Sequence, residues 1–468
     1  MSRINTNVSS LIAQRTLAKN NDNLNTSLQR LSTGLKINTG KDNPAGLIAS
    51  ENLKAETAGI TTAIDNANRA SNILGTAEGG LSEVSNLLTQ LQGLVGQAAN
   101  SGGLSKEELD ANQLQVDSIL STVNRISGST SFQGTKLLNG NFDYTTSTVG
   151  TSAITGLTVN SASVPDGSTV SVVVQTVSSG QTATLTSTQG TITGATVTLE
   201  VSGNLGTTQL SFASGTTVSS VVTAINGVKA STGVSAAVSG TALRVNSQSF
   251  GSSAFVGLKA LTGTYSTSGA KDTGVDAVVT VNGAAADVDG LNVKYRSGSL
   301  DVEFDLTGAV NHNAAIKQFG VTGGGASFAL GSKVTESDKA SIGIGSVSTG
   351  SLGNSTLGFL STLASGGANS LTSGNLVKTQ AILDKSIKQV SSLRGRLGAF
   401  QKFTIGSTVN SLGVAYENAT AAQSAISDTD FAAETANLTR SQILSQAATS
   451  ILTQANSAPQ AALSLLRG

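Results

Sequence analysis

The sequence has no cysteine or tryptophan, and it is poor in histidine, aromatic residues and charge. The absence of cysteine from all 468 residues excludes disulfides, zinc–thiolate sites and cysteine nucleophiles. A single histidine, His312, excludes an HExxH metalloprotease site, and we expect no histidine-activated nucleophile either. Its setting, GAVNHNAA, predicts a solvated loop residue.

Charged residues make up only 12% of the chain, and they balance to a formal net charge of zero. This balance argues against nucleic acid or an anionic membrane surface as the main partner. No stretch approaches the roughly 18 apolar residues of a membrane-spanning helix, so we expect no membrane insertion. The first residues, MSRINTNVSSLIAQ, lack the apolar core of a cleaved secretory signal.

Motifs for catalysis and cofactor binding are also missing. Neither GxGxxG nor GxxxxGK[ST] occurs, and the glycines at 322–325 and 343–350 lack the flanking context of a phosphate-binding loop. The acidic pairs Glu107–Glu108 and Asp428/Asp430 lie at expected helix starts, where carboxylates complement the helix dipole. We therefore predict no enzyme activity, no cofactor and no metal site.

Long helices are predicted at the N-terminal end, which has no aromatic residue before Phe132. One apolar stripe begins at Ile4, Val8 and Leu11, and a second contains Leu17, Leu24, Leu28, Leu31 and Leu35. A break follows at Asn38–Pro44, rich in turn residues. Further on, the apolar residues step by 3 and 4 as in a coiled coil, at Leu81, Val84, Leu88, Leu91, Val95 and Ala98. Ser105 and Glu108 form a capping-box pattern that opens a third helix.

The C-terminal end has the same character. One stripe runs through Leu383, Ile387, Val390, Leu393, Leu397 and Phe400, and it is followed by Ile405, Val409, Leu412 and Tyr416. Asp428 and Thr429 suit the start of a last helix, whose apolar residues are Leu444, Ala448, Ile451 and Ala455. Between the two helical ends, roughly from 143 to 350, alternation such as Val170, Val172, Val174 and turns such as Asn282–Gly283 predict antiparallel strands. The predicted fold class is multidomain α+β, with long terminal helices pairing as a coiled coil or bundle and a β-rich central insertion.

The terminal helices are too poor in large apolar residues to fold easily without neighbours. Fixing each residue costs about 1–2 kcal/mol, while each buried aliphatic side chain returns only about 1.5–3 kcal/mol. Residues 3–35 and 431–466 are rich in Asn, Gln, Ser and Ala. We therefore expect these helices to become ordered when several copies pack together, as in a polymer subunit.

Several segments resemble bacterial flagellin, the subunit of the flagellar filament. They are INTNVSSLIAQRTL, LQRLSTGLKINTGKDNPAGLIAS, NRISGSTSFQGTKLLNG and the long C-terminal stretch from ISDTDFAAE to SLLRG. The resemblance covers about 1–143 and 372–468, and residues 209–255 are also similar to a small repeat of flagellins and filament-cap proteins. It implies a structural protein that self-assembles into the filament used for swimming.

The resemblance also implies a division of the chain. Residues 1–44 and 427–468 correspond to the inner-tube helices, 45–143 and 372–426 to the adjoining helical domain, and 144–371 to a β-rich outer region. The self-assembly residues expected on the terminal helices are Ile4, Val8, Leu11, Leu24, Leu28, Leu31, Leu35, Phe431, Leu438, Leu444, Ile451, Leu463 and Leu466. The inter-domain spoke is expected at Asn38, Asp42, Pro44 and Gly46.

Partners and location follow from the same resemblance. They are other copies of the chain, a flagellar export chaperone, the hook–filament junction protein and the filament cap protein. We expect a secreted, extracellular protein exported through the flagellar type III route, and O-glycans on the central region are possible. Two alternatives stay open at this point: the hook–filament junction protein itself, or a surface adhesin that uses the β region.

One helix departs from the family pattern. Flagellins detected by the vertebrate innate receptor carry an arginine and a glutamate where this chain has Gln90 and Gly93, while Leu94 is retained. A neutral amide and a glycine replace a bidentate cation and a helix-favouring acid. The sequence therefore predicts weak or absent receptor activation.

Overall fold

The structure is a computed structural model that describes residues 6–100, 103–147, 153–165, 167–187, 189, 191–308, 310–312, 315–373 and 375–467, with side chains up to residue 457. The chain divides into two compact units. Unit 1 comprises Met1–Ala67, Leu330–Asp338 and Ser407–Gly468, and unit 2 comprises Asn68–Ala329 and Lys339–Gly406. The expected assembly residue Ile4 lies outside the described residues, and so do the side chains of Leu463 and Leu466.

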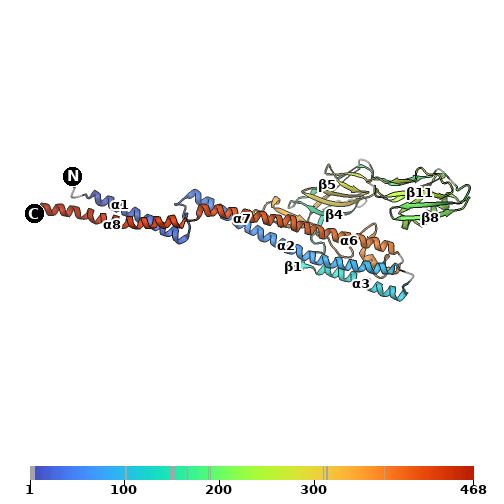
Figure 1. Ribbon diagram of the computed structural model, residues 1–468, viewed down its shortest axis with the longest axis horizontal. Helices are drawn as coiled ribbons and strands as arrows, with labels where there is room; N and C mark the ends of the chain where they lie inside the picture. Colours follow the sequence, from blue (N-terminus) through green and yellow to red (C-terminus); the bar gives the residue numbers. More distant parts are fainter. Residues whose placement is uncertain are drawn as a thin grey trace. The chain divides into compact units, whose positions relative to one another are not determined.

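Unit 1 is helical. Its elements are α1 (Val8–Thr33), the first part of α2 (Pro44–Ala98), α7 (Gly406–Ser427), α8 (Phe431–Arg467) and the short 3-10 turn η1 (Glu336–Asp338). Helices α1 and α8 lie side by side (Figure 1). Asn7, which precedes α1, caps it by accepting the backbone N–H of Ser10, and Gly34 ends it in the left-handed conformation.

The helical part of unit 2 consists of the remainder of α2, α3 (Lys106–Ser129), α6 (Leu376–Ala399) and the π-helical turn η4 (Phe400–Ile405). The heptad stripe predicted from Leu81 to Ala98 is confirmed, because all six of its residues are buried. The predicted capping box is also present, with Ser105 and Glu108 bonded reciprocally. Arg394 on α6 pairs with Glu78 on α2 at 2.8 Å.

Two short hairpins and two 3-10 turns complete this helical part. The hairpin strands are β1 (Ser131–Phe132) with β2 (Thr135–Lys136), and β21 (Gly353–Asn354) with β22 (Gly358–Phe359); the turns are η2 (Leu360–Leu363) and η3 (Leu371–Ser373). Buried Gln113 of α3 bonds to the backbone of Leu363 and Leu371. These bonds attach both turns to α3.

The first β subdomain is a pair of antiparallel sheets around one apolar core. One sheet has the order β14-β13-β5-β18-β3 and the other β15-β16-β17-β4. Alternating side chains from both sheets fill the core, where Phe304 and Phe319 meet edge to face. The strands are β3 (Tyr144–Ser147), β4 (Ile154–Ala162), β5 (Val170–Ser178), β13 (Val278–Val281), β14 (Ala284–Ala285), β15 (Asp287–Asp289), β16 (Asn292–Arg296), β17 (Leu300–Leu306) and β18 (Ala315–Gly324). A further hairpin, β19 (Ala326–Ala329) with β20 (Lys339–Ile342), follows them in the chain.

The second β subdomain has its own core and is inserted within the first. Its sheets have the orders β6-β10-β9 and β12-β11-β7-β8, and α4 packs its buried Val218, Val221 and Ile225 into the same core. The elements are β6 (Thr182–Thr186), β7 (Val197–Gly203), β8 (Gly206–Phe212), α4 (Val218–Gly227), α5 (Lys229–Thr232), β9 (Val234–Ser239), β10 (Ala242–Phe250), β11 (Phe255–Thr262) and β12 (Lys271–Thr273). The insert leaves at Gln181 and returns at Val275, and these two residues exchange backbone hydrogen bonds of 2.7 and 3.0 Å. The long terminal helices and the β-rich centre confirm the predicted α+β class.

Candidate assembly site

The seam between α1 and α8 is made of small and polar side chains. On α1 the buried residues are Ser10, Ala13, Asn20 and Ser27, and on α8 they are Glu434, Ser441 and Ala448. Half-buried leucines alternate with them at steps of 3 and 4, at Leu17, Leu24 and Leu31 on α1 and at Leu438 and Leu452 on α8. The seam is therefore a narrow coiled coil in which small or polar residues occupy every second position.

Polar side chains fix the two helices in an antiparallel register. The Asn7 side-chain amide donates to the Ala455 carbonyl at 2.7 Å, and the Ser10 hydroxyl donates to Asn456 at 2.7 Å. Further along, the Ser445 hydroxyl donates to Asn21 at 2.8 Å. Bonds of this kind depend on exact partners, so they specify register more sharply than leucines that repeat every seven residues.

Most of the large apolar side chains of this pair face away from the seam. Seven of the residues predicted for self-assembly are exposed: Val8, Leu11, Leu28, Leu35, Phe431, Leu444 and Ile451. The stripe predicted from Leu17 to Leu35 therefore divides, because Leu17, Leu24 and Leu31 enter the intrachain seam whereas Leu28 and Leu35 do not. Ile12 and Ile443, which are not among the predicted assembly residues, are also exposed. Ile12 lies four residues after Val8, which was a weak signal beside the leucines, whereas Ile443 lies three or four residues from none of the named residues.

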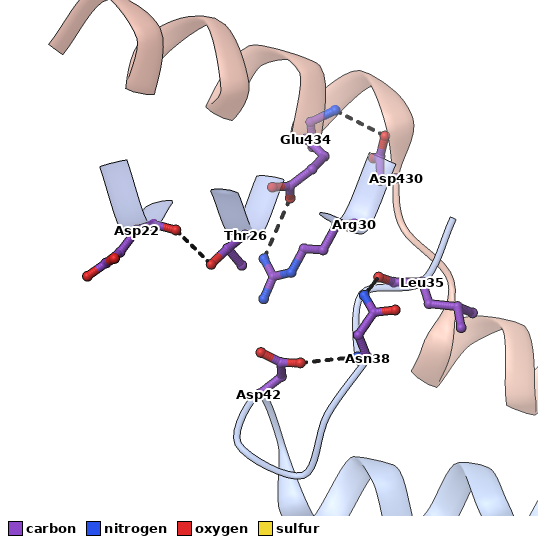
Figure 2. Close-up of polar contacts among 9 residues, drawn as sticks. Asp22, Thr26, Arg30, Leu35, Asn38, Asp42, Asp430 and Glu434 are labelled. Carbon is purple, nitrogen blue, oxygen red and sulfur yellow. Dashed lines mark hydrogen bonds and ion pairs between the residues drawn. The ribbon is translucent and has the colours of Figure 1, made fainter. Parts of the chain in front are cut away.

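A charged pair lies at the end of the seam nearest the loop 34–43 (Figure 2). Arg30 Nη1 lies 3.6 Å from Glu434 Oε2, and the side chains are 27% and 10% exposed. The Glu434 backbone N–H donates to the Asp430 carbonyl, and the Asp430 carboxylate caps α8 by accepting the N–H groups of Ala432 and Ala433. Glu434 thus faces its cation from the first turn of α8, where the helix dipole also favours a carboxylate.

The loop that follows α1 pairs briefly with the connection between α7 and α8. The Lys36 N–H donates to the Ser427 carbonyl at 2.7 Å, and the Thr429 N–H donates to the Gly34 carbonyl at 2.9 Å. Gly34, with a φ of +73°, supplies the left-handed turn that this geometry requires. These bonds therefore hold the loop after α1 and the connection between α7 and α8 together, beside the C-terminal end of α1.

Asp42 organises the remainder of this loop. One of its oxygens accepts the N–H groups of Asn38 and Thr39 and the Thr39 hydroxyl, at 2.8–3.1 Å. The Thr39 backbone bond, with help from the other two donors and from the Arg30 charge, lowers the pKa of the Asp42 carboxyl below its usual value. The side chain of Asn38 also donates to the Leu35 carbonyl (Figure 2). These bonds give the loop one defined conformation.

The start of α2 completes the loop. Asn43 accepts the Gly46 N–H at 2.9 Å, and Pro44 takes the first helical position, where its missing N–H costs nothing. A Cβ at Gly46 would lie 2.6 Å from the Cδ1 of buried Ile37. Glycine at this position therefore lets Ile37 pack against the helix.

The residues predicted to face the innate receptor lie on α2. Gln90 and Gly93 are exposed, and Leu94 is buried. A Cβ at Gly93 would meet nothing within 4 Å, so this position has room for a larger side chain.

The described part of the chain offers no group of three or more His, Cys, Asp or Glu side chains that could hold a metal ion. Within the same part, no helix is both long and apolar enough to cross a membrane. The exposed position of His312 agrees with the solvated loop residue expected from the sequence.

Comparison with known proteins places both ends of the chain in one family. The model of the bacterial flagellin N-terminal helical region matches residues 4–143, and the model of the C-terminal helical region matches 380–466. The flagellin hook IN motif matches 196–249, which overlaps the small repeat expected at about 209–255. The matched range includes the whole hairpin of β7 and β8, two strands that pair with each other.

Similar proteins cover the whole length. The chain is 32% identical to B-type flagellin of Pseudomonas aeruginosa and 31% identical to flagellin D of Vibrio cholerae, with 99% of both sequences covered in each comparison. Among solved structures, FliC from Burkholderia pseudomallei matches at 17% identity over 71% of this chain and 99% of that chain, with a TM-score of 0.25.

Proposed function

We propose that this chain, which belongs to the bacterial flagellin family and is a structural subunit of the flagellar filament, assembles through α1 and α8. The observation that carries the proposal is the division of side chains on this pair. Small residues close the intrachain seam, whereas Leu11, Leu28, Leu444 and Ile451 remain exposed. Exposed aliphatic residues on paired helices are the surface that further copies would cover.

The division of the chain inferred from the sequence is part of this proposal. Residues 1–44 and 427–468 supply the inner-tube helices, 45–143 and 372–426 the adjoining helical domain, and 144–371 the outer β region. The ordered loop around Asp42 supports the role of Asn38, Asp42, Pro44 and Gly46 as the spoke between the first two. The protein acts structurally, without catalysis.

The filament is extracellular, and we infer the route and the partners from the family. The chain is secreted through the flagellar type III apparatus with the help of an export chaperone. It meets the hook–filament junction protein at the base of the filament and the cap protein at its tip, and Ser and Thr residues of the β region are candidate O-glycan acceptors. The full-length likeness to flagellins favours the filament subunit over a junction protein or an adhesin.

Seeded extension tests the proposal. Purified monomer is added to short filament seeds and examined by electron microscopy, beside a version that ends after Ile426. A matched pair of substitutions refines the test: Leu444→Asp on α8 and Val238→Asp on β9, whose side chains are 46% and 50% exposed. We expect extension by the full chain and Val238→Asp, and none by the truncated chain and Leu444→Asp. Extension by the truncated chain would contradict the proposal.

Receptor silence is a second proposed property, supported by the exposed neutral side chain of Gln90 and by Gly93. In a cell-based receptor reporter assay, the protein should give a response about 5- to 30-fold weaker than an active flagellin, since losing a charged contact at an interface costs on the order of 1–2 kcal/mol. The double variant Gln90→Arg, Gly93→Glu should gain response. A full-strength response of the unaltered protein at low dose would contradict the prediction.

A further inference from the structure

The helix that joins α6 to α7 contains one residue more than a regular α-helix would hold. Between them, η4 is a π-helical turn in which the Gly406 N–H donates to the Gln401 carbonyl, five residues earlier. In an α-helix the acceptor lies four residues earlier. Neither proline nor a chain break accounts for this turn, since residues 376–427 are helical throughout and proline-free.

The extra residue separates two frames of buried residues. On α6, buried residues step by 3 and 4 to Val390, Leu393 and Leu397. The next fully buried residue is Ile405, eight positions after Leu397, and half-buried Val409 and Leu412 then resume the 4 and 3 steps. A regular helix would place position 404, not 405, in line with Leu397, because each residue turns the helix by 100°.

Removing one residue from η4 would bring Ile405 into the frame of α6. That isoleucine would then follow Leu397 by seven positions, and an unbroken α-helix would carry both stripes. The apolar stripes of α6 and α7 would both fit a regular α-helix that is one residue shorter. The π turn η4 therefore accommodates an additional residue that neither stripe requires.

The contacts of the η4 side chains show which residue the packing within the chain does not require. The Phe400 ring packs against Phe328 with ring centroids 6.1 Å apart, and the Gln401 amide donates to Ser71 at 2.8 Å. Phe403 is 68% exposed, and the Lys402 ammonium lies 5.3 Å from its ring centroid. Among the phenylalanines that the structure describes, the exposed ones are Phe403 and Phe431.

We propose that Phe403, the side chain that η4 turns outward, is an assembly contact with a second copy of this chain. The proposal rests on the filament function, and it adds a contact in unit 2 to those of α1 and α8. A second copy is the partner because a filament subunit is surrounded by identical chains at high local concentration. An exposed aromatic ring carries a large apolar area for such a contact, and aromatic residues are enriched at the energetic centres of interfaces.

Three variants test it: Phe403→Ala, deletion of Phe403, and deletion of the exposed residue Ser392 within regular α6. Thermal unfolding followed by circular dichroism reports on the helical frames. Deletion of Phe403 should leave the melting temperature of the helical domain within a few degrees of the wild type, because both stripes stay in frame. Deletion of Ser392 should lower it strongly, because every buried residue on one side of the deletion turns by 100°.

Seeded extension reports on the contact. Phe403→Ala and the Phe403 deletion should each raise the critical concentration for extension at least about tenfold, as loss of an interface aromatic does. Val238→Ala, an exposed valine on β9, should leave it unchanged. If both Phe403 variants extend seeds like the wild type, the contact is wrong. If deletion of Phe403 melts the helix as deletion of Ser392 does, the frame argument is wrong.

The Phe403 contact and assembly through α8 can be refuted independently of each other. Extension by the chain that ends after Ile426 would refute assembly through α8, whatever Phe403 does. Failure of that truncated chain to extend seeds, together with Phe403 variants that extend seeds like the wild type, would refute the π-turn contact alone.

Discussion

Replacing Glu434 by glutamine removes the charge that Arg30 faces at the base of the α1–α8 pair. At the observed 3.6 Å and an effective dielectric constant of about 20, the attraction is about 4–5 kcal/mol before desolvation is counted. Desolvation of a nearly buried carboxylate, and the entropy of holding a side chain that is 27% exposed, offset most of this. We expect a net loss of about 1–2 kcal/mol per subunit.

The critical concentration of seeded extension reports this loss, because the pair joins the two helices through which we propose that the chain assembles. A loss of 1–2 kcal/mol predicts an increase of about 5- to 30-fold. Arg30→Gln should act similarly, and the double variant should cost less than the sum of the two, with a coupling energy of about 1 kcal/mol. The matched control is Glu51→Gln, whose contact with Lys54 is exposed on both sides at 3.9 Å and should change the value less than about twofold.

Two results would refute this reasoning. One is a critical concentration for Glu434→Gln within twofold of the wild type. The other is a double variant whose effect equals the sum of the single effects, because the two side chains would then act independently.

Two further outcomes follow from the β core and from the loop. Phe304→Ala removes a fully buried ring that meets Phe319 edge to face at 6.3 Å, and it should destabilise the first β subdomain by about 3–5 kcal/mol in calorimetry while seeds still extend at room temperature; a loss below about 1 kcal/mol would contradict the packing argument. The lowered pKa of Asp42 means that its ionised form is bound better in the folded loop, so its contribution is complete above the unfolded pKa of about 3.9 and is lost as pH falls through the lower folded value. Asp42→Asn should therefore weaken extension at neutral pH and make it less sensitive to acid, and an unchanged acid profile would count against this role.

The long heptad of α2 was predictable from sequence because its large aliphatic residues are also its buried ones. Leu81, Val84, Leu88 and Leu91 are fully buried, as their spacing predicts. In such a stripe, hydrophobicity and periodicity point to the same face.

The seam of α1 and α8 was not predictable in the same way. Its buried positions are residues such as Ala13, Asn20, Ser27 and Ser441, which hydrophobicity ranks below the exposed leucines. Small side chains allow two helices to approach closely, and we propose that the exposed large aliphatic side chains contact other copies. A pattern read for one chain cannot tell an intrachain seam from a surface that is buried only in a polymer.

The π turn lies between these cases. The apolar stripe predicted from the sequence steps by five residues from Phe400 to Ile405, where every neighbouring step is 3 or 4. That irregular step contained the signal for an extra residue. Periodicity alone did not say whether a π turn, a kink or a loop would absorb it.

The second β subdomain leaves the first at Gln181 and rejoins it at Val275. This arrangement affects how the surface of the inserted subdomain can change. The two residues that flank the inserted segment 182–274 are hydrogen-bonded neighbours. The Gly180 N–H donates to the Asn311 side chain, whose amide donates to the Gly180 carbonyl. A different segment can therefore begin and end at the same two points without moving the strands beneath it. Selection for a new surface, or an engineer grafting a foreign module there, can replace about 93 residues while leaving α1 and α8, the helices proposed for assembly, as they are.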